Sequence, residues 1–429
     1  MNIPVIEVRA WGKLVGALAP DPKVGYYAFA YHPSWRCLGI ELAPVTMPVM
    51  DSPETFVFPN LQEATFRRLP AMIADALPDD FGNALIDAWM AEHGTTKSEV
   101  TTLDRLAYMG KRGMGALEFK PALGSHRESA APLKMKSLVE EARKVVERDL
   151  SADSHAKAAL ANIIRVGTSA GGARAKAVVA WNPVTNQIRS GQFDIASEFE
   201  PWIVKFDGIG KDFELGTGGD YGRTEYAYYK MATQAGIAMS PCRLLEESDR
   251  AHFMTRRFDR VVVRGNTIKH HVQTLCAMYH LDYKQRGTHA YSQLFMTVSQ
   301  LGLGDDAIQQ TFLRMAFNVM SRNCDDHTKN FSFLLRQGQS WELAPAYDVT
   351  HAYNPKGEWT YQHLMSVNGK FDEITRDDLL AEADRFGVPR KEELLGDVRS
   401  ALDNWTAHAK AADLSQRKID ELGRDFVLL

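Results

Sequence analysis

The sequence contains few cysteines and no long apolar run. Only four of the 429 residues are cysteine, and no two of them form a CxxC pair. This spacing argues against a disulfide framework or a zinc cluster and favours a reducing compartment. No apolar run approaches the ~20 residues needed to span a bilayer, and the first residues lack the basic start and apolar core of a signal peptide. We therefore expect a cytoplasmic protein with no membrane segment.

The charge balance shows no excess of one sign. The net charge is −4, and 45% hydrophobic with 24% charged residues is an ordinary globular composition. This balance argues against a broad surface for binding nucleic acid. At ~100–200 residues per domain, a chain of 429 residues is expected to form two or three domains or lobes.

The expected elements change from strands to helices along the chain. Strands are expected over segments rich in Val, Ile, Tyr and Phe, at residues 3–9, 25–42, 175–181 and 201–206. Helices are expected over segments with helical periodicity, at residues 61–93 with a break at 77–82, and at residues 137–165, 307–322 and 376–424. The turn Arg264–Thr267 predicts a β-hairpin. The sequence therefore predicts an α+β fold with a mainly helical last third.

The strongest motif is the pair Asp325 and Asn330, followed by Asp348. Protein kinases carry an Asp and an Asn five positions apart, where the Asp accepts the substrate hydroxyl proton and the Asn binds Mg²⁺. A second Asp, on a following strand, completes that metal site. Asp348 ends a predicted hairpin that begins after Asn330, and a hairpin returns its two ends to one place. Two protein ligands suffice for Mg²⁺ because the ion keeps several waters.

The same residue types are also common in turns and helix caps, and a lone D-x-x-x-x-N pattern is more often of that kind. Here the pattern follows an apolar helix, Ala307–Arg322, and precedes a hairpin that ends in Ala-Tyr-Asp. His327 lies inside the same loop, two residues after Asp325. This context favours a catalytic loop.

Two further segments fit nucleotide binding. Residues 166–176 are rich in Gly and small side chains, which let backbone amides approach phosphate oxygens, although a plain Gly-rich turn has the same composition. Lys205 lies in an apolar strand, and a buried lysine is costly without a partner. Kinases pair such a lysine with a helix Glu, for which Glu225 is a candidate. The structural alternatives are an edge-strand lysine that reaches solvent and an acidic residue that favours a helix N-terminus.

Residues 255–260 lie where a kinase hinge would meet adenine. Three charged residues in this segment, Arg257, Asp259 and Arg260, fit structural ion pairs equally well.

Taken together, these segments resemble the HipA-type kinases of bacterial type II toxin–antitoxin systems. The matching segments, in order, are the Gly-rich residues 167–176, the strand lysine in 203–206, and residues 257–260, 325–332 and 343–348. Residues 77–82 and 110–117 also resemble the family's N-terminal segments. The resemblance extends over about residues 70–350, and the D-x-H-x-K-N-F-S segment at 325–332 is its most specific element.

The resemblance implies a two-lobed, protein-kinase-like fold with a strand-rich N-lobe, an extra N-terminal α+β subdomain and a mainly helical C-lobe. On this chain the subdomain would occupy residues 1–125, the N-lobe 126–258 and the C-lobe 259–429. The implied cofactors are ATP and Mg²⁺.

The family's functional residues carry over onto matching positions of this sequence. Asp325 would be the catalytic base, with His327 beside it, and Asn330 and Asp348 would hold Mg²⁺. The positions implied to contact ATP are Gly167, Ser169, Gly171, Gly172, Lys205, Phe258 and Lys329. Ser169 matches a serine that the family autophosphorylates, which displaces the Gly-rich loop and inactivates the kinase.

The resemblance also implies partners. Family members phosphorylate aminoacyl-tRNA synthetases on a protein hydroxyl, which stalls translation. They bind a small helix-turn-helix antitoxin of the HipB type, and the complex represses its own operon. We therefore expect a serine/threonine kinase toxin that meets operator DNA mainly through the antitoxin.

The chain departs from the family at two places. After the hairpin, where many members carry a Glu-Asp pair, this chain has His271–Leu275. Arg256 stands at a hinge position that is acidic in some members. The role of His271–Leu275 stays open, with nucleotide or lobe contacts as the candidates. The change at Arg256 would affect side-chain contacts, whereas backbone hydrogen bonds to adenine would survive it.

Two other functions stay open. A small-molecule phosphotransferase of the aminoglycoside or sugar type shares the two-lobed scaffold, because fold does not fix substrate. A co-repressor that has lost catalysis is the second alternative. The intact Lys205, Asp325, Asn330 and Asp348 argue against the co-repressor.

Overall fold

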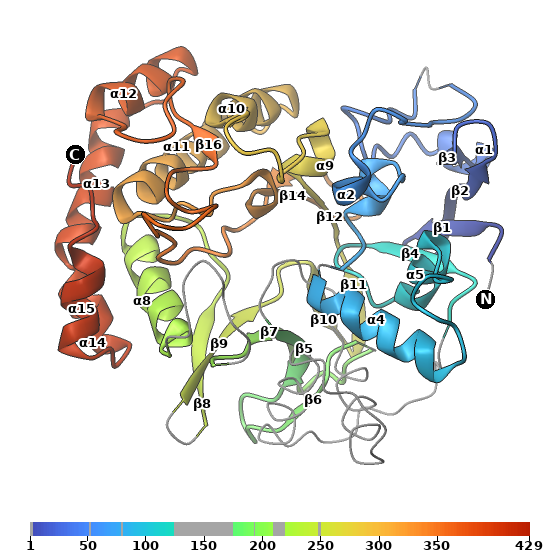
Figure 1. The fold of residues 1–429 in the computed structure, drawn as a ribbon, viewed down its shortest axis with the longest axis horizontal. Helices are drawn as coiled ribbons and strands as arrows, with labels where there is room; N and C mark the ends of the chain where they lie inside the picture. Colours follow the sequence, from blue (N-terminus) through green and yellow to red (C-terminus); the bar gives the residue numbers. More distant parts are fainter. Residues whose placement is uncertain are drawn as a thin grey trace. The chain divides into compact units, whose positions relative to one another are not determined.

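The computed structural model describes residues 3–50, 53–78, 80–123, 175–192, 194–208, 219–247 and 250–429. The chain divides into two compact units, each of which combines helices with strands (Figure 1). The first unit contains residues Met1–Gly210, Arg256–Asp282 and Leu334–Ser340. The second contains Lys211–Thr255, Tyr283–Phe333 and Trp341–Leu429. The three-part division into residues 1–125, 126–258 and 259–429 stays a prediction.

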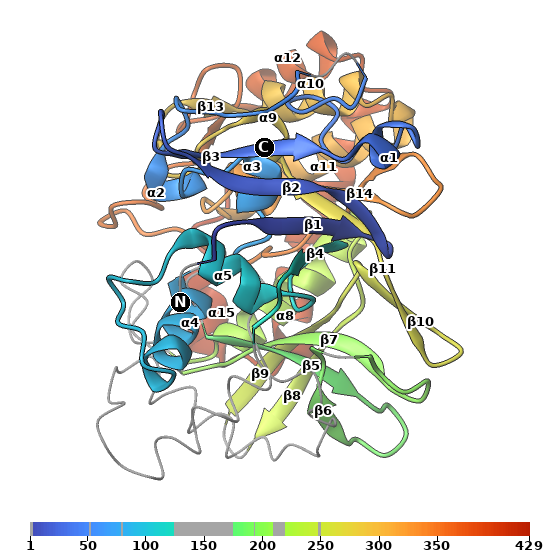
Figure 2. The same cartoon turned by 90° about the vertical axis from the view of Figure 1, so that its right-hand side faces the viewer.

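An antiparallel sheet with the strand order β3-β2-β1-β4 begins the first unit (Figure 2). Its strands are β1 (Ile6–Ala10), β2 (Lys13–Asp21), β3 (Tyr26–Tyr31) and β4 (Leu117–Lys120). Alternate residues of β1 are buried, because successive side chains of a strand point to opposite faces. The expected strand over residues 25–42 is wrong beyond Tyr31. Pro33 there begins helix α1 (Pro33–Arg36), and proline is favoured in the first helical turn, where its missing N–H is not needed.

The segment expected to be helical over residues 61–93 is divided into three helices. These are α2 (Glu63–Phe66), α3 (Ala71–Ala74) and α4 (Asp80–Glu92). Helix α2 ends because Arg67 adopts a left-handed conformation. Helix α5 (Thr102–Met109) begins with a capping box between Thr101 and Asp104. The helix expected over residues 137–165 lies outside the described residues.

A second group of strands in the first unit carries the strand lysine. Strand β5 (Lys176–Trp181) pairs antiparallel with β6 (Ile188–Ser190) and with β7 (Glu200–Lys205). Every residue of β5 is buried, so both faces of this strand are covered. The predicted hairpin is confirmed as β10 (Arg260–Val263) and β11 (Asn266–Lys269). Strand β12 (His271–Thr274) then leads into α9 (Leu275–Tyr279).

The second unit is mainly helical, as the sequence predicts. Its longest helix, α11 (Gly304–Ser321), is buried from Thr311 to Ser321 and packs against α10 (Tyr291–Gln300), α12 (Arg376–Arg385) and α13 (Lys391–Asp403). The other helices are α8 (Tyr221–Gln234), α14 (Trp405–Ala411) and α15 (Gln416–Gly423) (Figure 1). Among the residues that the structure describes, no helix is long and apolar enough to cross a membrane.

Short strands complete the described part of the chain. Strands β8 (Cys242–Glu247) and β9 (Arg250–Arg256) pair antiparallel, and β13 (His289–Ala290) pairs parallel with β16 (Met365–Ser366). Strands β14 (Ser332–Leu335) and β15 (Trp341–Leu343) follow the D-x-x-x-x-N motif. The Ala344 amide donates to the Ser332 carbonyl at 2.9 Å, which brings the end of the predicted hairpin back to its start.

Candidate active site

The D-x-x-x-x-N motif follows directly from the buried end of α11. Arg322 ends this helix in a left-handed conformation, with φ 57°. The backbone of Cys324 then donates to the Ala352 carbonyl at 3.1 Å. A single 3₁₀ turn, Thr328–Asn330, closes the loop. The helix and the bridge to Ala352 therefore fix the start of the segment that carries Asp325, and the 3₁₀ turn closes its end.

Asp325 is the exposed carboxylate of this loop. Half of its side chain, 50%, is accessible to solvent, and its Oδ1 lies 3.8 Å from His327 Nε2. The His327 ring in turn lies against Tyr283, with the ring centroids 5.2 Å apart. Lys329 places its Nζ over the same Tyr283 ring at 5.1 Å. An accessible carboxylate with a histidine beside it can accept a proton from an incoming hydroxyl group.

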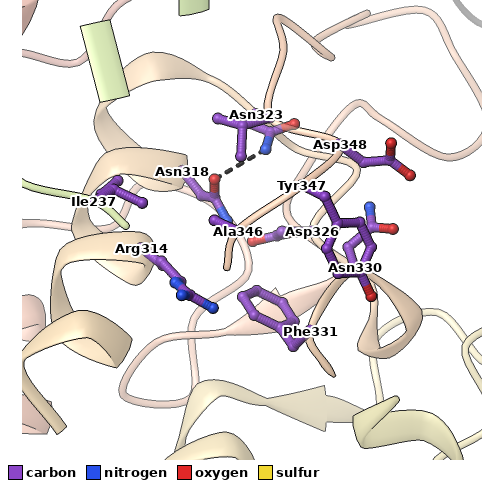
Figure 3. A pocket seen from close by; sticks show the side chains of 11 residues that line it. Ile237, Arg314, Asn318, Asn323, Asp326, Asn330, Phe331, Ala346, Tyr347 and Asp348 are labelled. Atoms are coloured by element: carbon purple, nitrogen blue, oxygen red, sulfur yellow. Dashed lines mark hydrogen bonds between the residues drawn. The ribbon is translucent and has the colours of Figure 1, made fainter. Parts of the chain in front are cut away.

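Asn330 and Asp348 line one pocket of the second unit (Figure 3). Asn330 Nδ2 donates to the Asp325 carbonyl at 2.7 Å, which leaves the amide oxygen to face the pocket. Asp348 has φ 54°, a left-handed conformation that is uncommon outside glycine and is often found at functional sites. In Figure 3 the two side chains lie at the same end of the pocket. The hairpin argument from the sequence therefore agrees with the structure.

The donor set at this pocket fits Mg²⁺. The ion prefers hard oxygen ligands, and the Asn330 amide and Asp348 carboxylate supply them. Within the described ranges, no three His, Cys, Asp or Glu side chains form a group that could hold a metal ion. The candidate site is a smaller set, one carboxylate and one amide, of the kind that Mg²⁺ completes with water and phosphate oxygens.

Tyr347 joins the segment before Asp348 to the candidate catalytic loop. Its hydroxyl donates to the Lys329 carbonyl at 2.7 Å and lies 2.5 Å from the Ser332 hydroxyl. Lys329 directly precedes Asn330, and Tyr347 directly precedes Asp348. The Tyr347 side chain therefore holds together the two segments that carry the candidate metal ligands, Asn330 and Asp348.

Arg314 is a buried cation in the wall of the same pocket, and the sequence reasoning did not identify it. Its Nη2 donates to the Ala344 carbonyl at 2.8 Å, in the segment that leads to Asp348. Burial lowers the pKa of the guanidinium to about 10. The signal in the sequence is an arginine inside the apolar stretch of α11, because a buried cation needs a specific role.

Asp326 and His363 form a second feature that sequence reasoning missed. Both side chains are buried, and His363 Nδ1 lies 2.9 Å from Asp326 Oδ2. Burial alone lowers the pKa of an imidazole, but the Asp326 carboxylate outweighs it and raises the pKa of His363 to about 10. The pair is therefore a buried ion pair at neutral pH. Its partners lie 37 residues apart, so local spacing could not connect them.

The other predicted site residues are distributed over both units. Lys205 is the last residue of β7 and Phe258 is half-buried after β9, and both belong to the first unit. Lys205 faces the buried Lys176 across the β5–β7 pair. Glu225 is buried in α8 of the second unit. Four predicted ATP contacts in the Gly-rich segment, Gly167, Ser169, Gly171 and Gly172, lie outside the described residues.

Arg257, Asp259 and Arg260 form a buried ion cluster in the first unit, which favours the structural interpretation of these residues. Arg257 Nε and Nη2 donate to the two Asp259 oxygens at 2.9 and 2.8 Å, and Arg260 Nη1 donates to Asp259 Oδ2 at 2.7 Å. Burial raises the pKa of a carboxyl group, but the two guanidinium groups outweigh it and hold the pKa of Asp259 well below its usual range.

This ion cluster holds a glycine segment near the end of the N-terminal family motif. The Gly115 amide donates to Asp259 Oδ2 at 2.8 Å, and Arg260 Nη2 donates to the Gly113 carbonyl at 2.7 Å. Gly115 has φ 74°, and a Cβ there would lie 3.0 Å from the Val272 amide nitrogen. Two segments that resemble the family, residues 110–117 and 257–260, are therefore in direct contact.

The departure at His271–Leu275 forms ordinary packing in the first unit. His271 is buried, and its Nε2 lies 3.0 Å from the Leu42 carbonyl oxygen. Burial lowers the pKa of His271 to about 4. Thr274 caps α9, and its hydroxyl donates to Asp75 Oδ1 at 2.9 Å. These contacts join β12 and α9 to the N-terminal part of the same unit.

Comparisons with known proteins agree with the residue-level resemblance. The family model described as the HipA-like C-terminal domain matches residues 168–406, and that of the HipA N-terminal domain matches residues 6–120. A search of curated protein sequences gives no match.

The chain matches two solved structures. The chain resembles HipA from Shewanella oneidensis, solved in a toxin–antitoxin complex with HipB and operator DNA, at 18% identity and a TM-score of 0.68, over 98% of this chain and 94% of that one. The proinflammatory kinase CtkA from Helicobacter pylori matches 53% of this chain and 88% of that one at 12% identity and a TM-score of 0.33. The similarity to the Shewanella protein confirms the predicted α+β, HipA-like fold. Because the C-terminal family model alone matches more than half of its residues, the chain belongs to the HipA family.

Proposed function

We propose that this chain is an ATP- and Mg²⁺-dependent serine/threonine protein kinase that acts as the toxin of a type II toxin–antitoxin system. The observation that carries the proposal is the pocket shared by Asn330 and Asp348, with Asn330 bonded to the backbone of Asp325. A phosphoryl-transfer site needs one carboxylate near the acceptor hydroxyl and oxygen ligands for the metal. The candidate loop supplies both kinds of group.

In this proposal the chain's residues mainly position the reactants and balance charge. Asp325 accepts the hydrogen bond of the substrate hydroxyl and takes its proton as the phosphoryl group is transferred. Asn330 and Asp348 would hold Mg²⁺, which neutralises charge on the phosphate oxygens when bound. Lys205 would contact the ATP phosphates and pair with Glu225, and Phe258 and Lys329 are also proposed to contact ATP. His327, beside Asp325, would help to orient that carboxylate.

The proposed partners follow from the family. A HipB-type helix-turn-helix antitoxin would bind the chain and carry it to operator DNA, because the similar Shewanella protein was solved with HipB and its operator. The proposed substrate is a hydroxyl of a translation component such as an aminoacyl-tRNA synthetase. The reaction would take place in the cytoplasm, where ATP and that substrate are present. Ser169 would be the autophosphorylation site that inactivates the kinase.

Mass spectrometry of the purified chain tests the proposal. The wild type and Asp325→Asn are incubated with ATP and Mg²⁺, and phosphorylated residues are mapped. We expect phosphate on Ser169 of the wild type and none on the variant, while both bind ATP. Retained transfer by Asp325→Asn would refute the catalytic role of Asp325. Phosphate on another residue of the wild type, but not on Ser169, would refute the autophosphorylation site.

A chain that binds ATP but never transfers phosphate to itself would require a different acceptor. Small hydroxyl compounds, such as aminoglycosides and sugars, would then be screened with the same wild type. Transfer to one of them would replace the protein-kinase proposal by a small-molecule phosphotransferase. Failure with every acceptor would favour the co-repressor.

A further inference from the structure

Asp326, next to the proposed base, has both carboxylate oxygens occupied inside the second unit. Its side chain is fully buried. Tyr291 donates its hydroxyl to Oδ2 at 2.7 Å, and the Leu364 amide donates to Oδ1 at 2.7 Å. His363 Nδ1 also lies 2.9 Å from Oδ2. The carboxylate therefore joins the start of α10 and the segment before β16 to the catalytic loop.

The network continues into α11, the helix that precedes the loop. Asn318 Nδ2 donates to the Tyr291 hydroxyl at 2.9 Å, and Asn323 Nδ2 donates to Asn318 Oδ1 at 2.9 Å. The thiol of Cys324 lies 3.8 Å from His363 Nε2. A buried network of this kind holds its members in one arrangement, because each broken bond leaves a polar group without water. The Asp326 carboxylate is thus held by three partners, the Tyr291 hydroxyl, the His363 ring and the Leu364 amide.

The peptide bond between Asp325 and Asp326 connects this network to the chemistry. The carbonyl of that peptide belongs to Asp325 and accepts the 2.7 Å hydrogen bond from Asn330 Nδ2. The Asp326 side chain fixes one side of the peptide, and Asn330 fixes the other. A displacement of this peptide would shift the Asp325 backbone, which carries the carboxylate, and the acceptor that holds the Asn330 amide. The proposed base and the proposed metal ligand therefore depend on one anchored peptide.

We propose that Asp326, held by Tyr291 and His363, is a positioning residue for the phosphotransfer site. It lies in the wall of the pocket that Asn330 and Asp348 line, but both its oxygens already accept hydrogen bonds within the second unit, so it acts through the backbone of Asp325 and the side chain of Asn330. This inference rests on the proposed function. It adds to the proposed base, Asp325, a second carboxylate, Asp326, which positions the reacting groups. Removing the hydrogen bonds of Asp326 misplaces the reacting groups, and a displacement of about 1 Å can cost about 100-fold in rate.

Asp326→Asn and Tyr291→Phe are the test variants, and Asp378→Asn is the matched control. Asp378 is also a buried carboxylate of the second unit, and it accepts bonds from Lys370, Thr375 and Asn368 at the start of α12. Asp378 lies outside the hydrogen-bond network around Asp326, so the Asp378→Asn variant reports how far general destabilisation alone lowers activity. Tyr291→Phe removes one hydroxyl and leaves the ion pair, which keeps a test available if Asp326→Asn does not fold.

The first measurement is phosphotransfer at saturating ATP. We expect kcat to fall about 100-fold in Asp326→Asn and about tenfold in Tyr291→Phe, with the KM for ATP within about twofold of wild type. The Mg²⁺ concentration for half-maximal rate should rise in both variants, because Asn330 is displaced. Asp378→Asn should keep the wild-type kcat and Mg²⁺ dependence. An equal loss of kcat in Asp378→Asn, or no loss in Tyr291→Phe and Asp326→Asn, would overturn the positioning role.

Hydrogen–deuterium exchange of the metal-free, nucleotide-free chain gives a readout that does not depend on activity. Exchange over residues 324–331 should increase in the two test variants and stay at the wild-type level in Asp378→Asn. Unchanged exchange over this loop in both test variants would refute the anchoring. A wild type that transfers no phosphate, with the expected exchange pattern, would refute the proposed function while the anchoring stands.

Discussion

Asn330 donates its side-chain amide to the carbonyl of Asp325 at 2.7 Å, so the proposed metal ligand and the proposed base are held by a direct hydrogen bond. This bond fixes which end of the Asn330 amide faces the pocket, because the nitrogen is used and the oxygen remains as the acceptor. A change at Asn330 therefore affects the metal and the base at once. The first prediction follows from this double role.

Asn330→Ala is expected to abolish phosphotransfer and to raise the Mg²⁺ concentration required for any residual rate. The alanine removes an oxygen ligand and leaves the Asp325 carbonyl without its donor. Phosphate transfer measured over a Mg²⁺ titration tests this expectation. Asn368→Ala is the control, since that amide donates to Asp378 instead. Equal Mg²⁺ dependence of Asn330→Ala and wild type would contradict the metal-ligand assignment.

Arg314→Leu is expected to weaken Mg²⁺-dependent activity with little change in thermal stability. The leucine removes a costly buried cation, which offsets the loss of its hydrogen bond to the Ala344 carbonyl. The segment that leads to Asp348 then loses the hydrogen bond from Arg314, so the proposed metal ligand Asp348 is held less firmly. Activity over a Mg²⁺ titration and a thermal melt are measured on the same sample. A large fall in melting temperature with unchanged Mg²⁺ dependence would assign Arg314 to stability alone.

Asp259→Asn is expected to destabilise the first unit by about 3–5 kcal/mol, because it leaves two buried guanidinium groups without their carboxylate. The pKa of Asp259 is depressed in the folded chain, so its stabilisation is present above the ordinary carboxyl pKa of about 4 and is lost as pH falls further. Urea denaturation at neutral pH measures the effect. Glu118→Gln is the control, since its partner Lys269 is less deeply buried. A loss below about 1 kcal/mol in Asp259→Asn would exclude a structural role for the cluster.

The sequence alone predicted the loop and the proximity of Asn330 and Asp348. The motif spacing located Asp325, Asn330 and Asp348, and the apolar helix before them and the hairpin after them placed the last two at one site. These features are local, and local patterns can be read along the chain. The roles of the residues stay predictions that the experiments above address.

The contacts that hold the loop could not be predicted in the same way. Asp326 contacts His363, which lies 37 residues further along the chain, and Arg314 contacts Ala344, which lies 30 residues further along. No regular sequence spacing predicts either contact, because both contacts depend on how α11 packs in the second unit. The error over residues 25–42 has a different cause. The apolar alternation continued past Tyr31, but Pro33 and the cap at His32 favour a helical turn there.

His363 is expected to make the stability of the second unit depend on pH on the alkaline side. The Asp326 carboxylate raises the pKa of His363 to about 10, above the value of about 6.5 for a free imidazole. The stabilisation is therefore fully present below about pH 6.5 and is lost as pH rises through about 10. The groups that face the imidazole are Asp326 and the Cys324 thiol, with the Tyr291 hydroxyl on the same carboxylate oxygen.

Urea denaturation between pH 6 and 10 should show a falling unfolding free energy in wild type and a flatter profile in His363→Gln. Cys324→Ala should keep the wild-type slope, because the carboxylate is the main source of the shift. If Cys324→Ala flattened the profile and His363→Gln did not, the thiol and not the ion pair would be the titrating group.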